Sequence, residues 1–429
     1  MLTTRPRGTN DFMPGEVEKW QYVEQVFRNI CHKYAYGEIR TPIFEHTELF
    51  LRGVGETTDI VEKEMYTFSD RSNRSITLRP ENTAAVVRAY LEHKLFSQVQ
   101  PTKLYYIGPM FRYDKPQAGR YRQFHQVGLE ILGAANPSAD AESIVVAIQF
   151  LKSLGLKMTD EADDGSLTLF INSIGCPNCR PNHMDELKEY LKINIGDLCD
   201  DCQNRFERNP LRILDCKNAS CQEITRGAPD IINFLCTECS NHFTGLKAHL
   251  DSVGITYTIN PRLVRGLDYY TKTTYEITSN ALGSQSSVCG GGRYDGLVEL
   301  CGGDPTPGVG FALGIERLIL TVEKKGNPFP NENTISVFVA SIGKESSLYA
   351  FSLTQSIRSA GISAESDMLG RSLRGQMKLA DKLKAKIVVI VGEDELKEGF
   401  LTIRNMGDGA QYQVPSEKIL DEIASKLSQ

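Results

Sequence analysis

What the sequence lacks excludes several classes of protein. It contains no apolar run approaching the roughly 18 residues of a membrane helix, no low-complexity tract and no internal repeat. No apolar stretch follows the arginines of Met1–Gly8, so we expect no signal peptide and a cytosolic protein with no membrane partner. A basic excess is also missing, because the formal net charge is −6. This charge argues against a protein that coats nucleic acid indiscriminately, although a local basic face could still bind an RNA.

The residues that are present indicate a globular protein with two or three domains, since there are 429 of them, 41% hydrophobic and 24% charged. Cysteine is concentrated: eight of the eleven lie between Cys176 and Cys239. In a reducing compartment, such clustering indicates metal or redox chemistry more than a disulfide scaffold.

The first part of the chain mixes helices and strands without a strict alternation. Apolar spacing predicts helices over Glu16–Tyr34 and Glu81–Leu95. The expected strands are Glu64–Phe68, Ser75–Leu78, Lys103–Tyr113 and Gln123–Leu132, and the last two form a hairpin around a polar loop. Because strands outnumber crossovers, we expect an α+β fold with a mostly antiparallel sheet flanked by helices.

From about residue 174 to 252 the chain becomes cysteine-rich and helical, and strands then resume. The expected later elements are strands at Ile255–Asn260, Thr273–Thr278 and Ser287–Gly291, and a helix from about Gly310 to Lys324. This order predicts one domain, residues 1–326, that carries a helical insertion at about 174–252.

A polar linker follows Lys324 and precedes a different pattern. The expected elements are the strand Ile335–Ala340, a helix to Ala360, a strand near Ser363–Glu365, the helix Ser372–Ala385 and the strand Ile387–Val391. Their alternation predicts a small α/β domain, residues 331–429, with a largely parallel sheet.

The helix Ser372–Ala385 and its flanks carry a basic stripe, which consists of Arg371, Arg374, Lys378, Lys382, Lys384 and Lys386. Leu373, Met377 and Ala380 lie at helical spacing, so we expect them to face the core and leave the basic side outward. Composition alone favours an ordinary solvated helix face over a nucleic-acid interface.

Three stretches could carry chemistry. In Phe111–Glu130, Arg112 is expected at a strand end, and Gln126, Gly128 and Glu130 share one face of the next strand. Gly128 is expected to leave room there for a ligand. A solvated hairpin with ordinary surface charges is the alternative.

The second stretch, Leu263–Thr271, offers Arg265 to a phosphate and paired tyrosines as walls for a small planar ligand. A capped loop with core tyrosines is the alternative. The third stretch is glycine-rich, Gly290–Gly296 followed by Gly308–Arg317. Glycine permits close backbone approach, although tight turns use it too.

In order and spacing these stretches resemble histidyl-tRNA synthetases, which are class II aminoacyl-tRNA synthetases. The resemblance runs over nearly the whole chain. Gly8–Phe12 resembles the family's start, and Arg40–Glu45 its dimer-forming motif 1. Phe111–Arg112 with its hairpin resembles motif 2, and Gly308–Arg317 motif 3. Leu263–Thr271 and Val288–Asp295 resemble the signatures of the histidine enzymes, and the C-terminal domain resembles their anticodon-binding domain.

The resemblance implies roles for individual residues. Arg112 would hold the α-phosphate of ATP, Arg265 would lie on its other side, and Arg317 would reach the adenine and the γ-phosphate. The implied histidine-binding residues are Glu81, Asn82, Thr83, Gln126, Glu130, Tyr269 and Tyr270, of which Asn82 departs from the glycine that is common there. The implied contacts to the tRNA acceptor end are Gln117, Arg120 and Arg122.

The implied reaction is ATP-dependent activation of L-histidine to an adenylate, followed by transfer to tRNA(His), with Mg²⁺ on the pyrophosphate part of ATP and a homodimer as the assembly. Negative charge builds on phosphate oxygens, so the site needs positioned cations more than a proton-transfer group. A pocket that hydrogen-bonds both imidazole nitrogens rejects analogues by ~10⁴ or more, so no editing domain is expected.

The cysteine pairs Cys176/Cys179, Cys199/Cys202 and Cys236/Cys239 have the C-x₂-C spacing of zinc sites, and Cys216/Cys221 accompany them. We expect a first structural zinc site from Cys176, Cys179, Cys199 and Cys202, and a second from the remaining four. Reduced buried thiols are the alternative. Many members of the family lack these cysteines, so zinc cannot be required for the reaction.

Two other classes of protein share some of these features. A catalytically inactive regulatory paralogue would lack the C-terminal domain and the signature arginine, and both are present here. An RNA-binding zinc protein would not need Arg112, Arg265 and Arg317 together. Histidine-dependent ATP–pyrophosphate exchange separates all three classes.

Overall fold

The computed structural model describes residues 3–55, 58–117, 119–159, 166–279, 287–330 and 334–427. The chain divides into two compact units, Met1–Met13 with Lys19–Phe329 and Pro14–Glu18 with Pro330–Gln429, and each has its own sheets and core. No helix in the described ranges is long and apolar enough to cross a membrane.

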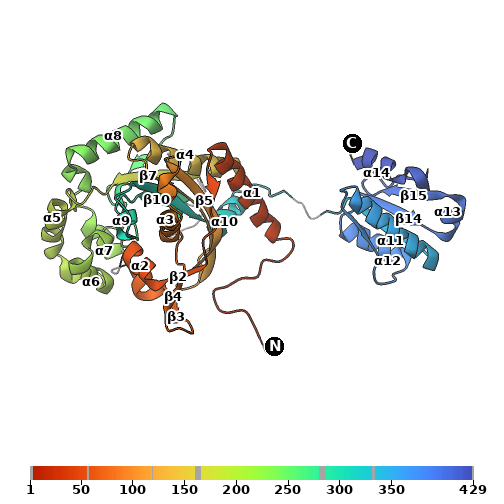
Figure 1. Ribbon diagram of the computed structural model, residues 1–429, viewed down its shortest axis with the longest axis horizontal. Coiled ribbons are helices and arrows are strands. Elements are labelled where there is room, and N and C mark those ends of the chain that lie inside the picture. The colour runs from red at the N-terminus through yellow and green to blue at the C-terminus, as the bar shows by residue number, and fades with distance from the viewer. Residues whose placement is uncertain are drawn as a thin grey trace. The chain divides into compact units, whose positions relative to one another are not determined.

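The larger unit is built on an eight-stranded sheet in the order β1-β5-β6-β11-β10-β9-β7-β8 (Figure 1). Its strands are β1 (Gly37–Glu38), β5 (Thr102–Phe111), β6 (Gln123–Leu132), β7 (Leu167–Ser173), β8 (Thr258–Ile259), β9 (Thr271–Ser279), β10 (Ser287–Arg293) and β11 (Gly308–Gly314). Only the outer pairs β1–β5 and β7–β8 are parallel, which confirms the expected antiparallel sheet.

Helices α1 (Val17–Lys33), α4 (Pro137–Ser153) and α10 (Ile315–Lys324) pack on this sheet through one continuous apolar core. In α1 the buried side chains Trp20, Val23, Phe27 and Ile30 repeat at helical spacing, as the sequence predicted. The beginning of α4 is fixed by the Asn136 side chain, which accepts a hydrogen bond of 3.0 Å from the amide of Ser138.

The prediction that one helix begins at about Gly310 was wrong. Residues Gly308–Gly314 form the central strand β11, and the helix α10 begins only at Ile315. The strand pairs on both sides, with β6 and with β10. Its hydrogen-bond partners are far away in the sequence, so apolar spacing within the segment does not reveal them.

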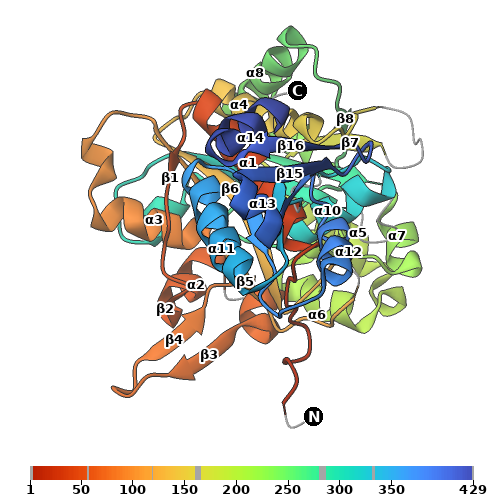
Figure 2. The same cartoon turned by 90° about the vertical axis from the view of Figure 1, so that its right-hand side faces the viewer.

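Helices α2 (Thr47–Val54), α3 (Thr83–Glu92) and α9 (Leu297–Leu300) contact one another. A small sheet, β2 (Phe44–His46), β4 (Ser75–Leu78) and β3 (Tyr66–Ser69), projects from the body of this unit (Figure 2). Its two outer strands pair antiparallel with β4.

The insertion is helical, as expected, and consists of α5 (Arg180–Lys192), α6 (Asp200–Arg208), α7 (Ala219–Thr225) and α8 (Thr237–Ser252), gathered at one end of the larger unit (Figure 1). Its eight cysteines form two groups. We call Cys176, Cys179, Cys236 and Cys239 the outer cluster, and Cys199, Cys202, Cys216 and Cys221 the inner cluster.

The expected pairing of cysteines was therefore wrong: Cys176/Cys179 meet Cys236/Cys239, and Cys199/Cys202 meet Cys216/Cys221. The reason is topological. The chain returns from α7 to the start of α5, where the amide of Cys236 donates a 3.1 Å hydrogen bond to Cys179 Sγ. The four cysteines of the inner cluster all lie in the segment between Cys179 and Cys236.

The smaller unit has a five-stranded sheet in the order β13-β12-β14-β15-β16. Its elements are β12 (Val337–Ser341), α11 (Lys344–Ser359), β13 (Ala364–Ser366), α12 (Leu373–Lys382), β14 (Ile387–Val391), α13 (Glu393–Glu398), β15 (Phe400–Asn405), β16 (Gln411–Pro415) and α14 (Ile419–Leu427). The alternating part is parallel as expected, but β15 and β16 add an antiparallel edge that the sequence reading did not predict. On α12, Ala380 is buried with Leu373 and Met377 packed against the same cluster, and Lys378 and Lys382 are exposed.

A buried ion pair joins the sheet to two helices. Arg293 on β10 and Asp140 on α4 are both fully buried and bonded to each other, and His242 Nε2 of α8 lies 3.2 Å from Asp140 Oδ1. Burial by itself would raise the pKa of Asp140, but the hydrogen bond with His242 and the charge of Arg293 hold it below its ordinary value. The carboxylate is thus ionised inside the core.

We predict that Asp140→Ala lowers the free energy of unfolding by about 3–5 kcal/mol, because it leaves the Arg293 charge buried and unpaired. Urea unfolding followed by circular dichroism measures the change. Glu207→Ala, which removes an exposed partner of Lys188, is the matched control and should change stability little. Equal effects of the two substitutions would contradict the prediction.

Candidate active site

A cavity of about 270 Å³ opens at the centre of the large sheet of the larger unit. Side chains from β6, β10, β11 and the start of α10 line one side, and the segment around residues 265–270 lines the other. The expected site residues that line it are Glu81, Thr83, Arg112, Arg120, Gln126, Glu130, Arg265, Tyr269, Tyr270 and Arg317.

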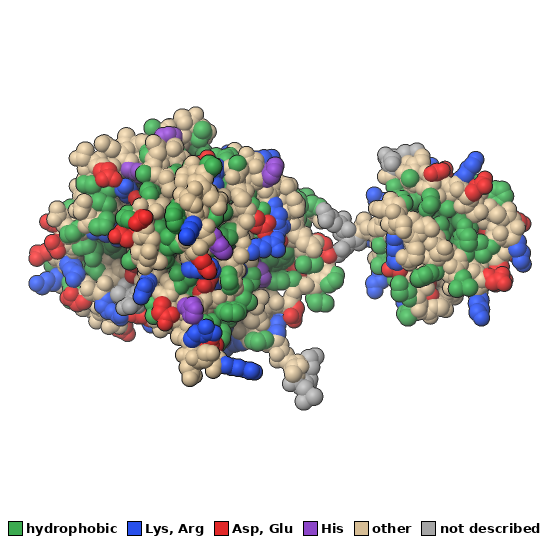
Figure 3. Space-filling model, in the orientation of Figure 1, with side chains coloured by type: hydrophobic (Ala, Val, Ile, Leu, Met, Phe, Trp, Pro, Cys, Tyr) green, Lys and Arg blue, Asp and Glu red, His purple; other side chains and the backbone are tan. Residues whose placement is uncertain are grey.

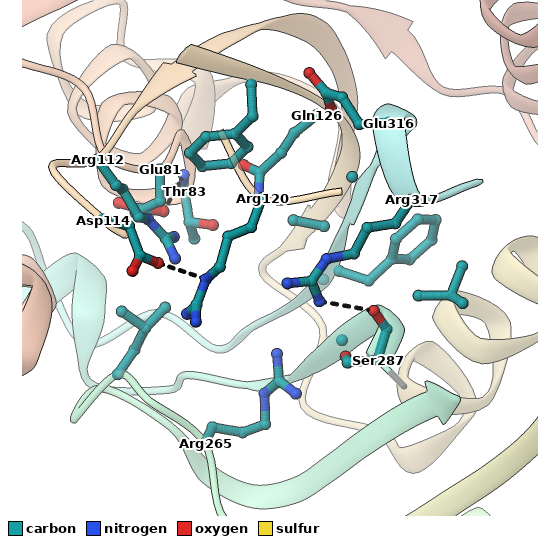
Figure 4. Close-up of a pocket in the computed structure, with 18 of the residues that line it drawn as sticks. Glu81, Thr83, Arg112, Asp114, Arg120, Gln126, Arg265, Ser287, Glu316 and Arg317 are labelled. Atoms are coloured by element: carbon teal, nitrogen blue, oxygen red, sulfur yellow. Dashed lines mark hydrogen bonds and ion pairs between the residues drawn. The ribbon is translucent and has the colours of Figure 1, made fainter. Parts of the chain in front are cut away.

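Four arginines line the cavity. The guanidinium groups of Arg112, Arg120, Arg265 and Arg317 point toward a common space (Figure 4). Arg112 follows the end of β5, Arg265 lies in the loop before β9, and Arg317 lies in the first turn of α10. Elements distant in the sequence therefore deliver the cations to one place.

Three of these arginines, Arg112, Arg265 and Arg317, are each held by an acceptor that leaves part of the guanidinium group facing the cavity. Arg112 Nε donates to the carbonyl of Pro80 at 2.8 Å, and Arg317 Nη1 donates to the carbonyl of Ser287 at 2.9 Å. Arg265 Nη1 donates to Glu276 Oε1 at 3.0 Å. Burial lowers the pKa of Arg112 and of Arg317. Burial also acts to lower the pKa of Arg265, but Glu276, Tyr270 and Asp215 together outweigh it and raise that pKa. All three remain charged, since an arginine starts so far above neutral pH.

Two of the central glycines make room for these side chains. A Cβ atom at Gly290 of β10 would collide with the guanidinium of Arg265, and one at Gly310 of β11 would collide with the carboxylate of Glu130. Gly310 lies directly opposite Glu130 in the sheet register. Gly128 behaves differently from our expectation: the space beside it is filled by the ring of Tyr106, so it is not open to a ligand.

Carboxylates and hydroxyls also line the cavity, and Glu81 lies beside Arg112. Glu130 is buried and accepts hydrogen bonds from Thr83 Oγ1 at 2.8 Å and from the Tyr294 hydroxyl. Glu81 accepts from the amides of Thr83 and Ala84 at 2.6 and 3.0 Å, so the same carboxylate also caps the start of α3. Burial raises the pKa of Glu81, and it raises that of Glu130 to about 8.

Two buried polar atoms of the cavity lining, Gln126 Oε1 and Arg265 Nε, have no hydrogen-bond partner among the described residues. Buried polar groups are normally satisfied. The aromatic rings of Tyr269 and Tyr270, with centroids 4.7 Å apart, form an adjoining wall. The cavity therefore offers unpaired polar groups and aromatic faces to a small polar ligand.

Three expected site residues do not line the cavity. Asn82 is buried below it, where its amide oxygen accepts hydrogen bonds from Thr41 and Arg79. Gln117 pairs with Arg120 through backbone hydrogen bonds in the hairpin loop. The guanidinium of Arg122 stacks 3.7 Å from the ring centre of Tyr113.

The sequence reading missed several residues that line or support the cavity. Tyr294 bonds to Glu130, Asp114 pairs with Arg120, and Glu316 binds the amide of His125 at 2.9 Å. Two of them stand next to residues that were singled out, since Tyr294 follows the Gly290–Gly292 run and Glu316 precedes Arg317. Their positions next to these residues could be seen in the sequence, but their hydrogen-bond partners, Glu130 and His125, could not.

Comparison with known proteins agrees with this geometry. The family model for histidyl-tRNA synthetase matches residues 8–196 and 203–318, and the model for the anticodon binding domain matches residues 336–426. The histidine–tRNA ligase of Desulforamulus reducens is 57% identical over 420 residues, with 98% of each chain covered. That of Pelotomaculum thermopropionicum is 56% identical over 428 residues, covering 100% of this chain and 99% of the relative.

Among solved structures, apo histidyl-tRNA synthetase from S. aureus matches with a TM-score of 0.82 and 41% identity, covering 98% of this chain and 100% of the other. Family models, identity over the full length and the fold all agree. The chain belongs to the histidyl-tRNA synthetase family.

Proposed function

We propose that this protein is a histidine–tRNA ligase, which activates L-histidine with ATP to histidyl-adenylate and transfers the histidyl group to tRNA(His) for protein synthesis. The observation that carries the proposal is the lining of one cavity, where the guanidinium groups of Arg112, Arg265 and Arg317 face a common space beside Glu81, Glu130 and the paired tyrosines. A nucleotide phosphate fits the arginines, and an amino acid with a ring fits the carboxylates and the tyrosines. Histidine-dependent ATP–pyrophosphate exchange tests it.

In the activation step, the histidine carboxylate attacks the α-phosphate in line, and pyrophosphate leaves. Negative charge builds on the phosphate oxygens, and preorganised cations stabilise it without a proton transfer. Arg112 and Arg265 are the catalytic residues of this step, one on each side of the α-phosphate. Arg317 binds the adenine and the γ-phosphate.

Histidine binding uses the carboxylates and the aromatic rings of the lining. Glu81, Glu130 and Thr83 surround the ammonium, while Gln126 and the tyrosines Tyr269 and Tyr270 contact the imidazole. The unpartnered Gln126 Oε1 supplies one acceptor for an imidazole N–H. Asn82 contributes indirectly, because it holds Arg79 at the base of α3 through a 3.1 Å hydrogen bond. A buried site that hydrogen-bonds its ligand in this way leaves polar groups unpaired when an analogue binds, which gives specificity without editing.

Mg²⁺ would accompany the β- and γ-phosphates and neutralise charge on the leaving pyrophosphate. The carboxylates that line the cavity could provide only a few of its ligands. Glu316 already binds His125 and Asp114 pairs with Arg120, so phosphates and water would provide most ligands, as is usual for Mg²⁺.

The tRNA is proposed to meet both parts of the chain. The hairpin loop with Gln117, Arg120 and Arg122 would contact the acceptor end, and residues 331–429 the anticodon, with residues 1–326 as the catalytic domain. On α12 and its flanks, Arg374, Lys378, Lys382 and Lys384 are exposed and available to phosphates. Elsewhere charges of both signs are interspersed, as the visible face of the larger unit shows (Figure 3).

A homodimer in the cytosol is the proposed working form. Ile43, Phe44 and Phe68 are 43%, 51% and 49% exposed on and beside the small sheet that follows Arg40, and exposed apolar groups of this kind mark protein interfaces. None of the eleven cysteines is in a disulfide, which suits a reducing compartment.

Arg265→Ala should slow histidyl-adenylate formation by about 10²–10³-fold, because one preorganised charge at the α-phosphate is lost. Pyrophosphate exchange measures the rate, and histidine binding should weaken much less. Arg262→Ala is the matched control, since that guanidinium binds the carbonyl of Ala228 in the insertion and does not line the cavity. A nearly unchanged exchange rate in Arg265→Ala would contradict the catalytic role of Arg265.

Histidine binding should release most of one proton from Glu130. Its carboxyl, with a pKa of about 8, is largely protonated near pH 7.5 and must ionise to pair with the ammonium, while free imidazole is already mostly neutral there. Calorimetry in buffers of different ionisation enthalpy counts the protons. Release should fade as the pH rises above the pKa, and Glu130→Gln should abolish it and weaken binding. The absence of proton release in the unaltered protein would contradict this role.

The double substitution Lys378→Glu with Lys382→Glu should lower kcat/KM for tRNA charging and reduce its salt dependence, because two phosphate contacts are lost. Pyrophosphate exchange should remain unchanged. Lys397→Glu on α13, an exposed residue outside the basic stripe, serves as the control. Normal charging by the double variant would exclude this face from tRNA binding.

A further inference from the structure

The outer and inner cysteine clusters have the geometry of metal sites. Within each cluster all four sulfur atoms lie within 4.8 Å of one another. The Sγ atoms of Cys176 and Cys179 are 3.7 Å apart, those of Cys176 and Cys236 are 3.9 Å apart, and those of Cys199 and Cys216 are 3.8 Å apart. A tetrahedral zinc with bonds of about 2.3 Å has sulfur–sulfur edges of about 3.8 Å. A disulfide would need about 2.05 Å.

Backbone amides support the sulfur atoms. The amide of Cys236 donates to Cys179 Sγ at 3.1 Å, that of Cys199 to Cys221 Sγ at 3.3 Å, and that of Asn218 to Cys216 Sγ at 3.4 Å. Such donors stabilise thiolates and orient ligands around a bound metal. Two cysteines of each cluster are buried and the other two are partly buried, so the protein covers both sites.

The short helices around the clusters need a cross-link to be stable. Helices α5, α6 and α7 contain 13, 9 and 7 residues, and helices of this length are marginal unless packing stabilises them. In α6 only Cys202 and Phe206 are buried. A metal bound by four thiolates supplies the cross-links that a small module otherwise lacks.

The outer cluster is also tied to the cavity wall. Arg180, which follows Cys179, donates from its guanidinium to the carbonyl of Tyr270. On the other pair, Glu238 lies between Cys236 and Cys239 and binds Lys272 Nζ at 2.8 Å. Both halves of the cluster therefore hold the segment Tyr270–Lys272 from outside the cavity.

The backbone just before the cluster holds the same segment. The amide of Ile174 donates to the carbonyl of Lys272, and the amide of Lys272 donates to the carbonyl of Gly175, both at 2.8 Å. Lys272 has a left-handed φ of 51°, which is costly for a residue with a side chain and needs neighbours that impose it. The position of Tyr270 in the cavity thus depends on residues 174–180 and 236–239 being held together.

We infer that the outer and inner clusters each bind a structural Zn²⁺, and that the outer zinc positions Tyr270 in the wall of the amino-acid pocket. Four thiolates with no open position favour zinc and a structural role. The metal takes no part in the chemistry. Cys176, Cys179, Cys236 and Cys239 act as positioning residues, and this second part of the inference rests on the proposed function of the cavity.

The inner cluster provides an internal comparison. Its helix α6 is anchored to a different place, where Arg205 binds Asp59 at 2.8 Å and Arg208 binds Glu62. Its link to the 265–270 loop passes through Asn209, which donates a 2.9 Å hydrogen bond to Asp268. Within the described residues, we find no hydrogen bond from its cysteine pairs to residues 270–272. Loss of the inner metal should therefore disturb the histidine pocket less than loss of the outer one.

The test combines metal content with steady-state kinetics on the full-length protein. Protein purified without added metal should contain about two zinc ions per chain, one for each cluster, by elemental analysis. Cys236→Ser should lose one zinc and raise the KM for histidine about tenfold, with little change in the KM for ATP. Cys236→His, which restores a zinc ligand, should recover both the metal and the KM.

Three further variants complete the design. Cys216→Ser should lose one zinc with a smaller rise in the histidine KM. Arg180→Gln should keep both zinc ions and raise the histidine KM, so it tests the link to Tyr270 even if the cysteine variants fold poorly. Cys31→Ala, a buried cysteine outside both clusters, should alter neither quantity.

Zinc below about 0.2 per chain in the unaltered protein, with all eight thiols titratable before unfolding, would overturn the metal sites. An unchanged histidine KM in Arg180→Gln, or equal rises in Cys236→Ser and Cys216→Ser, would overturn the positioning role. Failure of the proposed function looks different, because exchange would then be absent while the zinc content stayed at its expected value.

Discussion

The concentration of positive charge in one cavity is the constraint around which the larger unit is arranged. Arg112, Arg265 and Arg317 come from three distant parts of the chain and face the same space. Like charges repel, so each guanidinium needs an acceptor, and these are the carbonyl of Pro80, the carboxylate of Glu276 and the carbonyl of Ser287. The two carbonyls hold Arg112 and Arg317 without cancelling their charge, whereas Glu276 forms an ion pair with Arg265. In the proposed function, the phosphates of ATP complete the charge balance.

A wide antiparallel sheet suits this task, because its central strands bring backbone from distant segments side by side. The strands β6, β11 and β10 are neighbours although the first and last are more than 150 residues apart. Glycines at Gly290 and Gly310 leave the space that Arg265 and Glu130 occupy. Side chains larger than hydrogen at these two positions would displace Arg265 and Glu130.

The insertion illustrates how a segment outside the reacting centre can shape it. Residues of its outer cluster segment, Arg180 and Glu238, bond to Tyr270 and Lys272. Its last helix, α8, contacts the core through His242, which lies beside the Asp140–Arg293 pair. The small unit carries its own sheet and its own apolar core. The proposed function assigns chemistry, support of the pocket and RNA recognition to separate parts of one chain.

The sequence by itself determined the family resemblance, the α+β class, the hairpin of β5 and β6, and most of the charged residues that line the cavity. These depend on local spacing: alternation in strands, apolar faces in helices, and arginines next to glycines. The exposed basic face of α12 followed from the same kind of pattern.

Only the tertiary structure decided which distant groups meet. It made Gly308–Gly314 a strand because partners exist on both sides, and it filled the space beside Gly128 with Tyr106. It placed Asn82 below the cavity and brought Tyr294 to Glu130. It joined Cys176/Cys179 to Cys236/Cys239 instead of Cys199/Cys202. Each of these outcomes depends on how the chain returns to itself over tens to hundreds of residues, and residue spacing along the sequence contains no measure of that return.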